Sequence, residues 1–572
     1  MFKIIDATDD STLQEYIVTL RDPADLESFY DDMETPGGDL YIPNRAVECT
    51  DRRLISANTH YKLTPVEAQT LQDDPRVIAV TPLQLELDSI KPFYTTSTNF
   101  WSKDNVVSAA YKNWGLLRCT EGVNRSGWGR DSTGSAAGSV TINAEGKNVD
   151  VVIIDGHIDP NHPEFAVNED GTGGSRVIQF NWFSLNPVVT AMSSGTYVYT
   201  PYSNGVTALS EDNNHGTHVA GTVAGNTQGW ARQANIYNIS PYSTGGNNLA
   251  ATNLWDYVRA WHNSKPINPA TGRKNPTICN CSYGSTFTFP YSGSFTTTSI
   301  TYVNWRGIDK GDVSFVNTMT TTELTSSSIY VGGGTANAPV VDMPYFSTSV
   351  RSDILAALAD GIIVVAAAGN DSFYMDSTTG IDYDNYAIAG YNGINYLWYS
   401  NRGSAPAAVP GVICVGALDS NTSEYKASFS NTGPRIDLYA PGVYIMSSLN
   451  TSSGVSVSGA DTRNPYYKIT KLSGTSMASP QVTGVLASAL EIYPRSTGTQ
   501  ITNYILGLTT TGQMGTTSGG ISDTTDINGG ANKILFLRQE RPVAGPVFPK
   551  TNVDLRPSNG AVYPRPRIRR SK

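Results

Sequence analysis

The chain has 572 residues, of which 39% are hydrophobic and 16% charged, and its formal net charge is −10. This length allows one large domain and a smaller one, because single hydrophobic cores stop growing at about 250–300 residues. No apolar run reaches about 18 residues, which argues against a membrane-spanning helix. The N-terminus lacks the basic and apolar regions of a signal peptide. We therefore expect a cytoplasmic or particle-associated protein rather than a Sec-secreted one.

The first 90 residues are acidic, with 18 Asp and Glu against 7 Lys and Arg. Residues 16–20 and 77–81 are rich in β-branched side chains and predict strands, and residues 23–33 predict a helix. Thr64-Pro65-Val66-Glu67 is a capping box with Pro at the first helical position, which predicts a second helix. The order strand, helix, helix, strand is typical of a small α+β domain.

Two segments further along place polar residues at the edges of predicted buried elements. Residues 151–154 are all β-branched and predict a buried parallel strand, with Asp155 at its carboxyl end. Catalytic groups of open α/β sheets lie at such strand ends. The segment Asp212-Asn213-Asn214-His215-Gly216-Thr217-His218 is expected to open a buried helix whose Gly and Ala residues allow close packing.

Two more segments carry an amide and a hydroxyl. Residues 361–370 predict another buried strand, which ends in Gly-Asn with Asn370 last. The segment Ser473-Gly474-Thr475-Ser476-Met477-Ala478-Ser479-Pro480 is a small-residue turn that presents Ser476. A Ser hydroxyl is a weak nucleophile unless a base lies beside it and donors receive the developing oxyanion.

These four segments, in the order Asp, His, Asn, Ser, resemble those of the subtilisin-like serine proteases, the subtilases. The order differs from those of the chymotrypsin and α/β-hydrolase folds. The resemblance implies an α/β fold whose doubly wound, mostly parallel sheet has helices on both faces. It also implies a serine endopeptidase with the catalytic triad Asp155, His215 and Ser476. Asn370 would be the side-chain donor of the oxyanion hole.

The resemblance further implies a polypeptide substrate that binds as an added extended strand. Most family members carry Leu at the Tyr283 position, which bears on the shape of the first specificity pocket. No cofactor is required, although structural calcium is common in the family; its ligands are not identified, and neither nucleic acid nor membrane is expected as a partner. The residues expected to line that pocket are Ser282, Tyr283 and Gly284 on one side and Ala367, Ala368 and Gly369 on the other.

The acidic N-terminal segment resembles the inhibitory propeptide of many subtilases, a ferredoxin-like α+β domain. Its C-terminal tail would thread through the active site as an intramolecular inhibitor, with any processing site between Leu87 and Lys112. The alternative is an accessory domain that is never removed. The expected organisation is a propeptide-like domain at 1–90, a linker at 91–112, a catalytic domain at 113–537 with insertions near 286–345 and 373–401, and a Pro/Arg-rich extended tail at 538–572.

A different class of function also fits the sequence. The two insertions are long and polar, and loops of such length are usually lids or interaction surfaces. Together with the basic tail, they suit a structural or assembly protein of a particle or virion, built on a subtilase scaffold with weak or no proteolysis. A protease that acts within a larger assembly would combine both readings. A reactive Ser476 distinguishes an enzyme from an inert scaffold.

Overall fold

The computed structural model describes residues 3–83 except 6, 44, 46 and 48, together with 90–92, 95–96, 114–122, 144–185, 189, 212–241, 251–289, 300–311, 330–331, 341–391, 394–420, 423–450, 459–515 and 526–537. The predicted tail at 538–572 and most of the predicted linker lie outside these residues. Within the described residues, no helix is long and apolar enough to cross a membrane.

A nine-stranded sheet forms the centre of the fold, and all its neighbouring strands are parallel except the last pair. Its central strands are almost wholly buried, as their β-branched sequences predict. From one edge to the other the strands are β9 (Val177–Ile178), β10 (Asn235–Ile239), β8 (Asp150–Ile154), β11 (Thr277–Cys281), β17 (Ile363–Ala367), β20 (Ile413–Leu418), β21 (Leu438–Pro441), β26 (Lys533–Ile534) and the antiparallel β25 (Thr510–Thr511).

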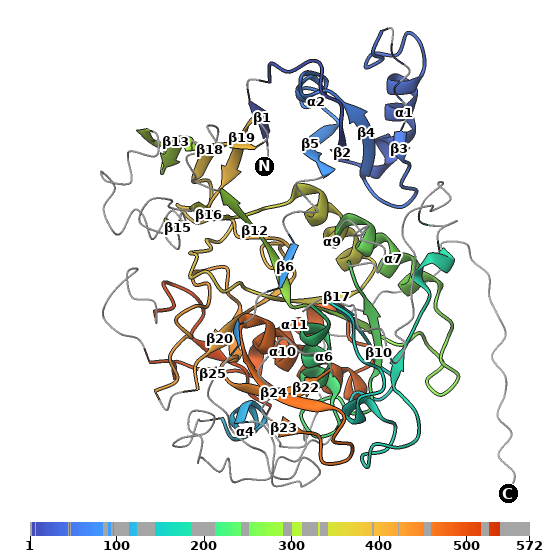
Figure 1. The fold of residues 1–572 in the computed structure, drawn as a ribbon, viewed down its shortest axis with the longest axis vertical. Helices are drawn as coiled ribbons and strands as arrows, with labels where there is room; N and C mark the ends of the chain where they lie inside the picture. Colours follow the sequence, from blue (N-terminus) through green and yellow to red (C-terminus); the bar gives the residue numbers. More distant parts are fainter. Residues whose placement is uncertain are drawn as a thin grey trace, which may run out of the picture. The chain divides into compact units, whose positions relative to one another are not determined.

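Helices cover both faces of this sheet, which confirms the predicted doubly wound architecture (Figure 1). On one face α6 (Asp212–Ala224) packs against α10 (Thr475–Ile492), which is buried from residue 475 to residue 490. On the other face lie α7 (Ala251–Ser264) and α9 (Thr348–Ala359), which also contact each other. The remaining helical segments of this part are α4 (Trp114–Glu121), α11 (Gly498–Gly507), η2 (Pro163–Phe165) and η3 (Trp182–Leu185).

The N-terminal residues form a separate antiparallel sheet in the order β3-β4-β2-β5, with one helix in each crossover, which is the ferredoxin-like arrangement. The capping box at Thr64 and Glu67 is present. Strands β3 and β4 were not predicted from the sequence; β3 has only three residues, and β4 buries the polar residues Asn58, Thr59 and His60. The elements are β2 (Gln14–Leu20), η1 (Pro23–Asp25), α1 (Leu26–Glu34), β3 (Cys49–Asp51), β4 (Asn58–Leu63), α2 (Pro65–Leu71) and β5 (Val77–Pro82).

The predicted insertions contribute ordered strands rather than only loops. Five strands form one sheet in the order β1-β19-β18-β13-β14, and a second sheet has the order β15-β16-β12-β6; all their strands except β1, β6 and the start of β12 lie in the insertions. A third sheet, β22-β24-β23 with β7 paired to β24, lies outside the insertions. Their bounds are β1 (Lys3–Ile5), β6 (Ile90–Pro92), β7 (Thr95–Thr96), β12 (Tyr283–Phe289), β13 (Ile300–Trp305), β14 (Ile308–Gly311), β15 (Tyr330–Val331), β16 (Val341–Pro344), β18 (Tyr386–Tyr391), β19 (Ile394–Tyr399), β22 (Ile445–Leu449), β23 (Gly459–Ala460) and β24 (Lys468–Ser473).

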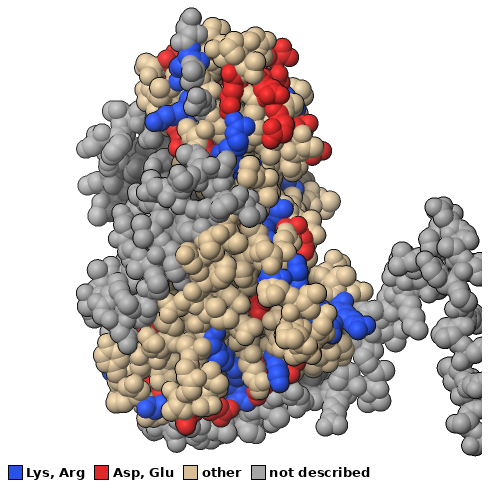
Figure 2. Space-filling view, turned by 90° about the vertical axis from the view of Figure 1, so that its right-hand side faces the viewer, with Lys and Arg blue, Asp and Glu red and all other residues tan. Residues whose placement is uncertain are grey.

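The acidic excess of the N-terminal segment is visible on the surface. On the face drawn in Figure 2, carboxylates gather at the top, where the N-terminal domain lies. Asp22, Glu27 and Asp31, at the start of and along α1, are among its exposed carboxylates.

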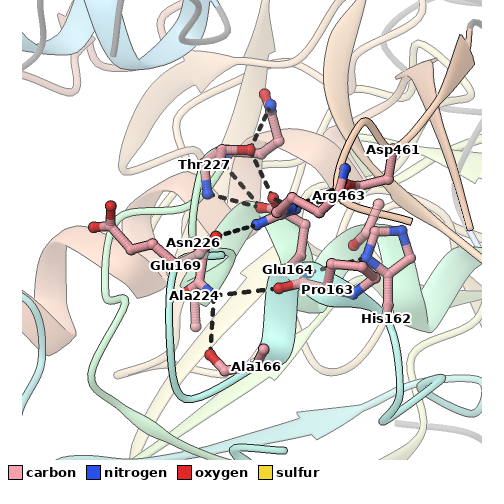
Figure 3. Close-up of polar contacts among 12 residues, drawn as sticks. His162, Pro163, Glu164, Ala166, Glu169, Ala224, Asn226, Thr227, Asp461 and Arg463 are labelled. Carbon is pink, nitrogen blue, oxygen red and sulfur yellow. Dashed lines mark hydrogen bonds and ion pairs between the residues drawn. The ribbon is translucent and has the colours of Figure 1, made fainter. Parts of the chain in front are cut away.

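A buried charge network ties together three loops beside the central sheet (Figure 3). The Glu164 carboxylate accepts hydrogen bonds from the Thr227 hydroxyl at 2.6 Å and the Thr227 amide at 3.0 Å, and it pairs with Arg463. Arg463 also pairs with Asp461, and all three charged side chains are at most 2% exposed. The network thereby fixes the loop after β8, the end of α6 and the turn before β24.

Glu164 makes the fold sensitive to acid. Burial alone would raise the pKa of Glu164, but the Arg463 guanidinium and the Thr227 hydrogen bonds outweigh it and hold the pKa at about 2, against an ordinary 4.5. A depressed carboxyl pKa stabilises the fold above the unfolded-state value, and this stabilisation is lost as the pH falls from 4.5 toward 2.

We predict that Glu164→Gln lowers the free energy of unfolding at pH 7 by about 3 kcal/mol, because the change removes a buried, paired charge. The measurement is urea unfolding in a Ser476→Ala background, which removes the hydroxyl expected to be reactive. The gap between the two proteins should shrink as the pH falls from 4.5 toward 2. Glu169→Gln is the matched control: Glu169 is 65% exposed and pairs with Arg232, so little change is expected. A gap that stays constant over that pH range would show that Glu164 is not held ionised by the network.

Candidate active site

Asp155 and His215 meet at the carboxyl end of β8. The Nδ1 of His215 lies 2.7 Å from Oδ1 of Asp155, and both side chains are at most 3% exposed. Asp155 directly follows β8, and its Oδ1 also accepts the Gly156 amide at 2.7 Å. A carboxylate acceptor at Nδ1 assigns the proton to that nitrogen and leaves Nε2 as the basic one.

Gly216 allows this approach. A Cβ at Gly216 would lie 2.3 Å from the carbonyl oxygen of Gly156, so only glycine lets α6 come this close to the residue after Asp155. The helix then carries His215 directly over the end of β8. The small residues of the segment around His215 thus have the packing role that the sequence predicts.

Ser476 is the second residue of α10, and it is fully buried. Its Oγ donates to the carbonyl oxygen of Ser282 at 2.7 Å. The Ser282 hydroxyl in turn donates to the carbonyl oxygen of Ser476 at 3.0 Å and lies 2.9 Å from the Ser479 hydroxyl. The first turn of α10 therefore packs closely against the segment that joins β11 to β12.

Asn370 lies just after β17, next to the start of α10. Its Oδ1 accepts the backbone amide and the hydroxyl of Thr475, both at 2.9 Å. These two bonds use the oxygen of the amide and so fix which way its nitrogen points. Among the described residues, the buried Nδ2 of Asn370 has no hydrogen-bond partner. A buried donor left in this way is costly unless a ligand supplies the acceptor.

Asn431 is a residue that the sequence did not single out, and it holds the loop that carries Asn370. Its Nδ2 donates to the Ala368 carbonyl at 2.7 Å, and its Oδ1 accepts the amides of Asp371 at 3.2 Å and Phe373 at 2.9 Å. Its backbone amide donates to the Gly369 carbonyl at 2.9 Å. Asn431 therefore forms hydrogen bonds with the chain on both sides of Asn370, and it is only 2% exposed.

Gly369 completes this turn. Its φ of 112° lies in the region that favours glycine, and a Cβ there would lie 2.4 Å from Nδ2 of Asn431. The sequence around Asn431, Ser430-Asn431-Thr432-Gly433, carries no signal of this role, because the partners of Asn431 lie about 60 residues away in sequence. The only available clue was the Gly369-Asn370 pair that follows the predicted strand, because such a turn needs a hydrogen-bonding partner to fix its conformation.

The predicted pocket residues lie near these groups. Ser282 lies between two strands, because β11 ends at Cys281 and β12 begins at Tyr283. Ser282, Tyr283, Ala367 and Ala368 are buried, at no more than 6% exposed. Cys279 and Cys281 are buried and free, as small packed residues on β11.

The chain's own residues pair with β12. Strand β6 lies antiparallel to it, with Pro92 opposite Tyr283, Lys91 opposite Gly284 and Ile90 opposite Ser285. Three residues after Pro92, Thr95 lies opposite Ser473, which is three residues before Ser476. Strand β6 therefore pairs beside Ser282, whose carbonyl binds the Ser476 hydroxyl, and β7 pairs with the segment just before Ser476.

Two other histidines of this region, His218 and His162, lie within hydrogen-bonding distance of backbone carbonyls. The His218 Nε2 lies 3.0 Å from the Ile445 carbonyl and 3.2 Å from the Thr470 carbonyl, and burial lowers the pKa of His218 to about 3. The His162 Nε2 lies 2.9 Å from the Lys468 carbonyl, and burial lowers the pKa of His162 as well. Within the described ranges, no group of three or more His, Cys, Asp or Glu side chains is arranged to hold a metal ion.

A parallel sheet that presents Asp, His and Ser in this chain order defines a subtilisin-like α/β protein. The profile of the subtilase family matches residues 146–522, well over half of the chain. The chain belongs to the subtilase family.

Individual relatives are more distant. Subtilisin DY of Bacillus licheniformis is 34% identical over 162 residues, which cover 28% of this chain and 44% of that protein. Subtilisin amylosacchariticus of Bacillus subtilis subsp. amylosacchariticus is 26% identical over 356 residues, 62% of this chain and 59% of the relative. The chain thus spans about half the length of the curated relatives it matches.

Two solved structures are similar to this chain. A cold-adapted subtilisin-like serine proteinase is 22% identical, with a TM-score of 0.41, and the match covers 75% of this chain and 98% of the other. Fervidolysin from Fervidobacterium pennivorans, a keratinolytic enzyme related to subtilisin, is 18% identical, with a TM-score of 0.48 and coverage of 92% and 61%.

Proposed function

We propose that this protein is a serine endopeptidase that cleaves polypeptides through an acyl-enzyme on Ser476. The observation that carries the proposal is the buried Asp155–His215 hydrogen bond of 2.7 Å at the carboxyl end of β8. Ser476, in the first turn of α10, lies at the same end of the sheet. A paired Asp and His, with the proton on Nδ1, is the arrangement that a general base for a Ser hydroxyl needs. Membership of the subtilase family supports the same reaction.

In the proposed reaction, His215 Nε2 removes the Ser476 proton as Oγ attacks a peptide carbonyl. The Ser476 hydroxyl now donates to the Ser282 carbonyl, so it has to turn toward His215 before attack. A substrate N–H that binds the Ser282 carbonyl favours this turn, because it competes for the same acceptor. His215 then delivers the proton to the leaving amine, and water releases the acyl group. Asp155 keeps the imidazole in one tautomer and stabilises its cationic form.

Two donors receive the developing oxyanion in this proposal. One is Asn370 Nδ2, the buried amide nitrogen that the Thr475 bonds leave available. The other is the Ser476 backbone N–H in the first turn of α10, where the helix dipole also favours negative charge. Preorganised donors of this kind act only as charge develops, so they raise turnover rather than affinity.

We infer that the chain's own N-terminal part is the first substrate and inhibitor of this site. Strand β6 occupies the edge of β12 that an extended substrate would take, and β7 pairs with the segment just before Ser476. This pairing supports a processing bond between Pro92 and Thr95, inside the wider interval that the sequence allowed. Hydrolysis there adds one water and leaves a carboxylate on the first fragment and an amine on the second.

Labelling with a fluorophosphonate tests the proposed activity, because this reagent phosphonylates a Ser only when a base activates it. We expect the label on Ser476 of the purified chain, and intact masses that show a cut between Pro92 and Thr95. Ser476→Ala should show neither.

The other outcomes are equally informative. A label without a cut supports an active site with an unprocessed N-terminal domain. If nothing is labelled, even after residues 1–92 are removed, the endopeptidase proposal fails. The assembly protein on a subtilase scaffold then becomes the better account.

We predict that Asn370→Ala lowers kcat on the order of 100- to 1000-fold, a magnitude established with subtilisin itself and therefore a family value. Asn431→Ala should lower kcat on the order of 100-fold, because a donor displaced by about 1 Å loses that much. KM should change little in both variants, since the oxyanion exists only in the transition state.

The double variant separates a positioning role of Asn431 from a general packing role. If Asn431 acts only through Asn370, Asn370→Ala with Asn431→Ala should be no slower than Asn370→Ala alone. Multiplying losses would show that Asn431 supports the site by another route. Steady-state kinetics on a peptide substrate, with unfolding curves for each variant, decides between the two.

A further inference from the structure

A buried arginine joins the N-terminal domain to the two helices α7 and α9. Arg53 lies between β3 and β4, and its side chain is 1% exposed. Its Nε donates to Asp256 on α7 at 2.7 Å, and its Nη2 donates to Asp353 on α9 at 3.1 Å. The two carboxylates are also no more than 1% exposed. A fully buried ion cluster therefore spans this contact.

Neighbouring residues of the same loop complete the cluster. The Ser56 hydroxyl donates to Oδ1 of Asp353, and the side-chain Nδ2 of Asn58 donates to its Oδ2 at 2.8 Å. Even with Arg53 beside it, burial raises the pKa of Asp256 to about 7. Replacing Arg53 within the intact contact would leave two adjacent buried carboxyls without their cation, which is strongly unfavourable.

The first strand of the chain forms a second link, to the sheet built from the insertions. Strand β1 pairs antiparallel with β19, with Lys3 opposite Leu397 and Ile5 opposite Asn395. On its other edge, the Gln72 side chain accepts the Ile4 amide at 2.7 Å and donates to the Ile4 carbonyl at 3.2 Å. The strand is thus bound on one side to the insertion sheet and on the other to the N-terminal domain.

The third link is hydrophobic. The core of the N-terminal domain, which includes Tyr16 and Phe29, continues without a break into buried side chains of the insertions. Separation would expose these insertion residues to water, together with the free edge of β19. The buried insertion residues of this core are Val303, Met343, Tyr345, Ala387, Ala389, Ile394, Tyr396 and Trp398.

We propose that residues 3–82 stay bound to the catalytic domain as a permanent subunit after the chain is cut between Pro92 and Thr95. The insertions and the Asp256/Asp353 pair form the surface that retains them. Processing then opens the site by freeing strand β6 from β12, because β6 has only three residues, while the domain itself does not leave. This inference deepens the proposed function and rests on it for the cut, whereas the retention stands on the contacts alone.

Self-processed wild-type protein gives the first test. After processing, the two fragments should elute together in size-exclusion chromatography in native buffer and separate only under denaturing conditions. Recovery of the catalytic fragment by itself, with the N-terminal fragment released or digested, would overturn the proposal.

A second test does not depend on catalysis. In Ser476→Ala, a recognition sequence for a site-specific protease is inserted between Glu86 and Leu87, upstream of β6, and the purified chain is cut there. The proposal predicts that the fragments remain associated on dilution. If they separate, retention is wrong whether or not the wild type cuts itself. If they remain associated but the wild type never cuts or labels, only the proposed activity fails.

Arg53→Met in this inserted background should weaken association on the order of 100-fold or more, because it leaves buried carboxylates uncompensated. Arg52→Met is the matched control: Arg52 pairs with Glu34 and lies over the Tyr30 ring, both within the N-terminal domain. Its association should be that of the parent.

Adding Asp256→Leu to Arg53→Met should recover part of the loss, because it removes one of the two buried carboxyls that have lost their cation. This second variant keeps the test decisive even if Arg53→Met alone is poorly folded. Equal weakening by Arg52→Met and Arg53→Met, or no recovery in the double variant, would show that the ion cluster does not hold the subunit.

Discussion

The close approach of α6 to the carboxyl end of β8 is the constraint on which the site depends. The approach requires a residue without a side chain at Gly216, against the Gly156 carbonyl, and it places His215 over Asp155. The same small-residue packing recurs where α6 meets α10: a Cβ at Gly484 would lie 2.8 Å from the Val223 carbonyl. The two helices share one face of the sheet, so the strand end, the His and the Ser helix are set by a single packing arrangement.

Much of this arrangement could be predicted because it is local in sequence. The apolar, β-branched runs before Asp155 and before Asn370 mark buried parallel strands without any tertiary information, although β17 ends at Ala367, three residues before Asn370. The capping box at Thr64 likewise fixes the start of α2. In each case the residues that decide the structure lie within a few positions of one another.

What could not be predicted depends on partners distant in sequence. Asn431 acts on a loop about 60 residues before it, and Arg53 finds its carboxylates about 200 and 300 residues later. Strand β4 was missed for the same reason. Asn58 is buried because its side chain donates to the Ser349 carbonyl on α9, and Thr59 is buried on the opposite face, where its hydroxyl lies 3.1 Å from Sγ of Cys49. A pattern of alternating hydrophobicity cannot register polar residues buried on both faces.

The contact between the N-terminal domain and helices α7 and α9 is polar, and this determines how strictly it fixes their geometry. An apolar contact of the same area tolerates small displacements, whereas a buried Arg between two carboxylates is stable only in one geometry. The insertions add an apolar core and a strand partner around it, so that the contact combines specificity with burial. A contact whose only task was to guide folding and then separate would gain nothing from a buried cation. The combination is better matched to an N-terminal domain that stays in place while the short strand beside Ser476 moves.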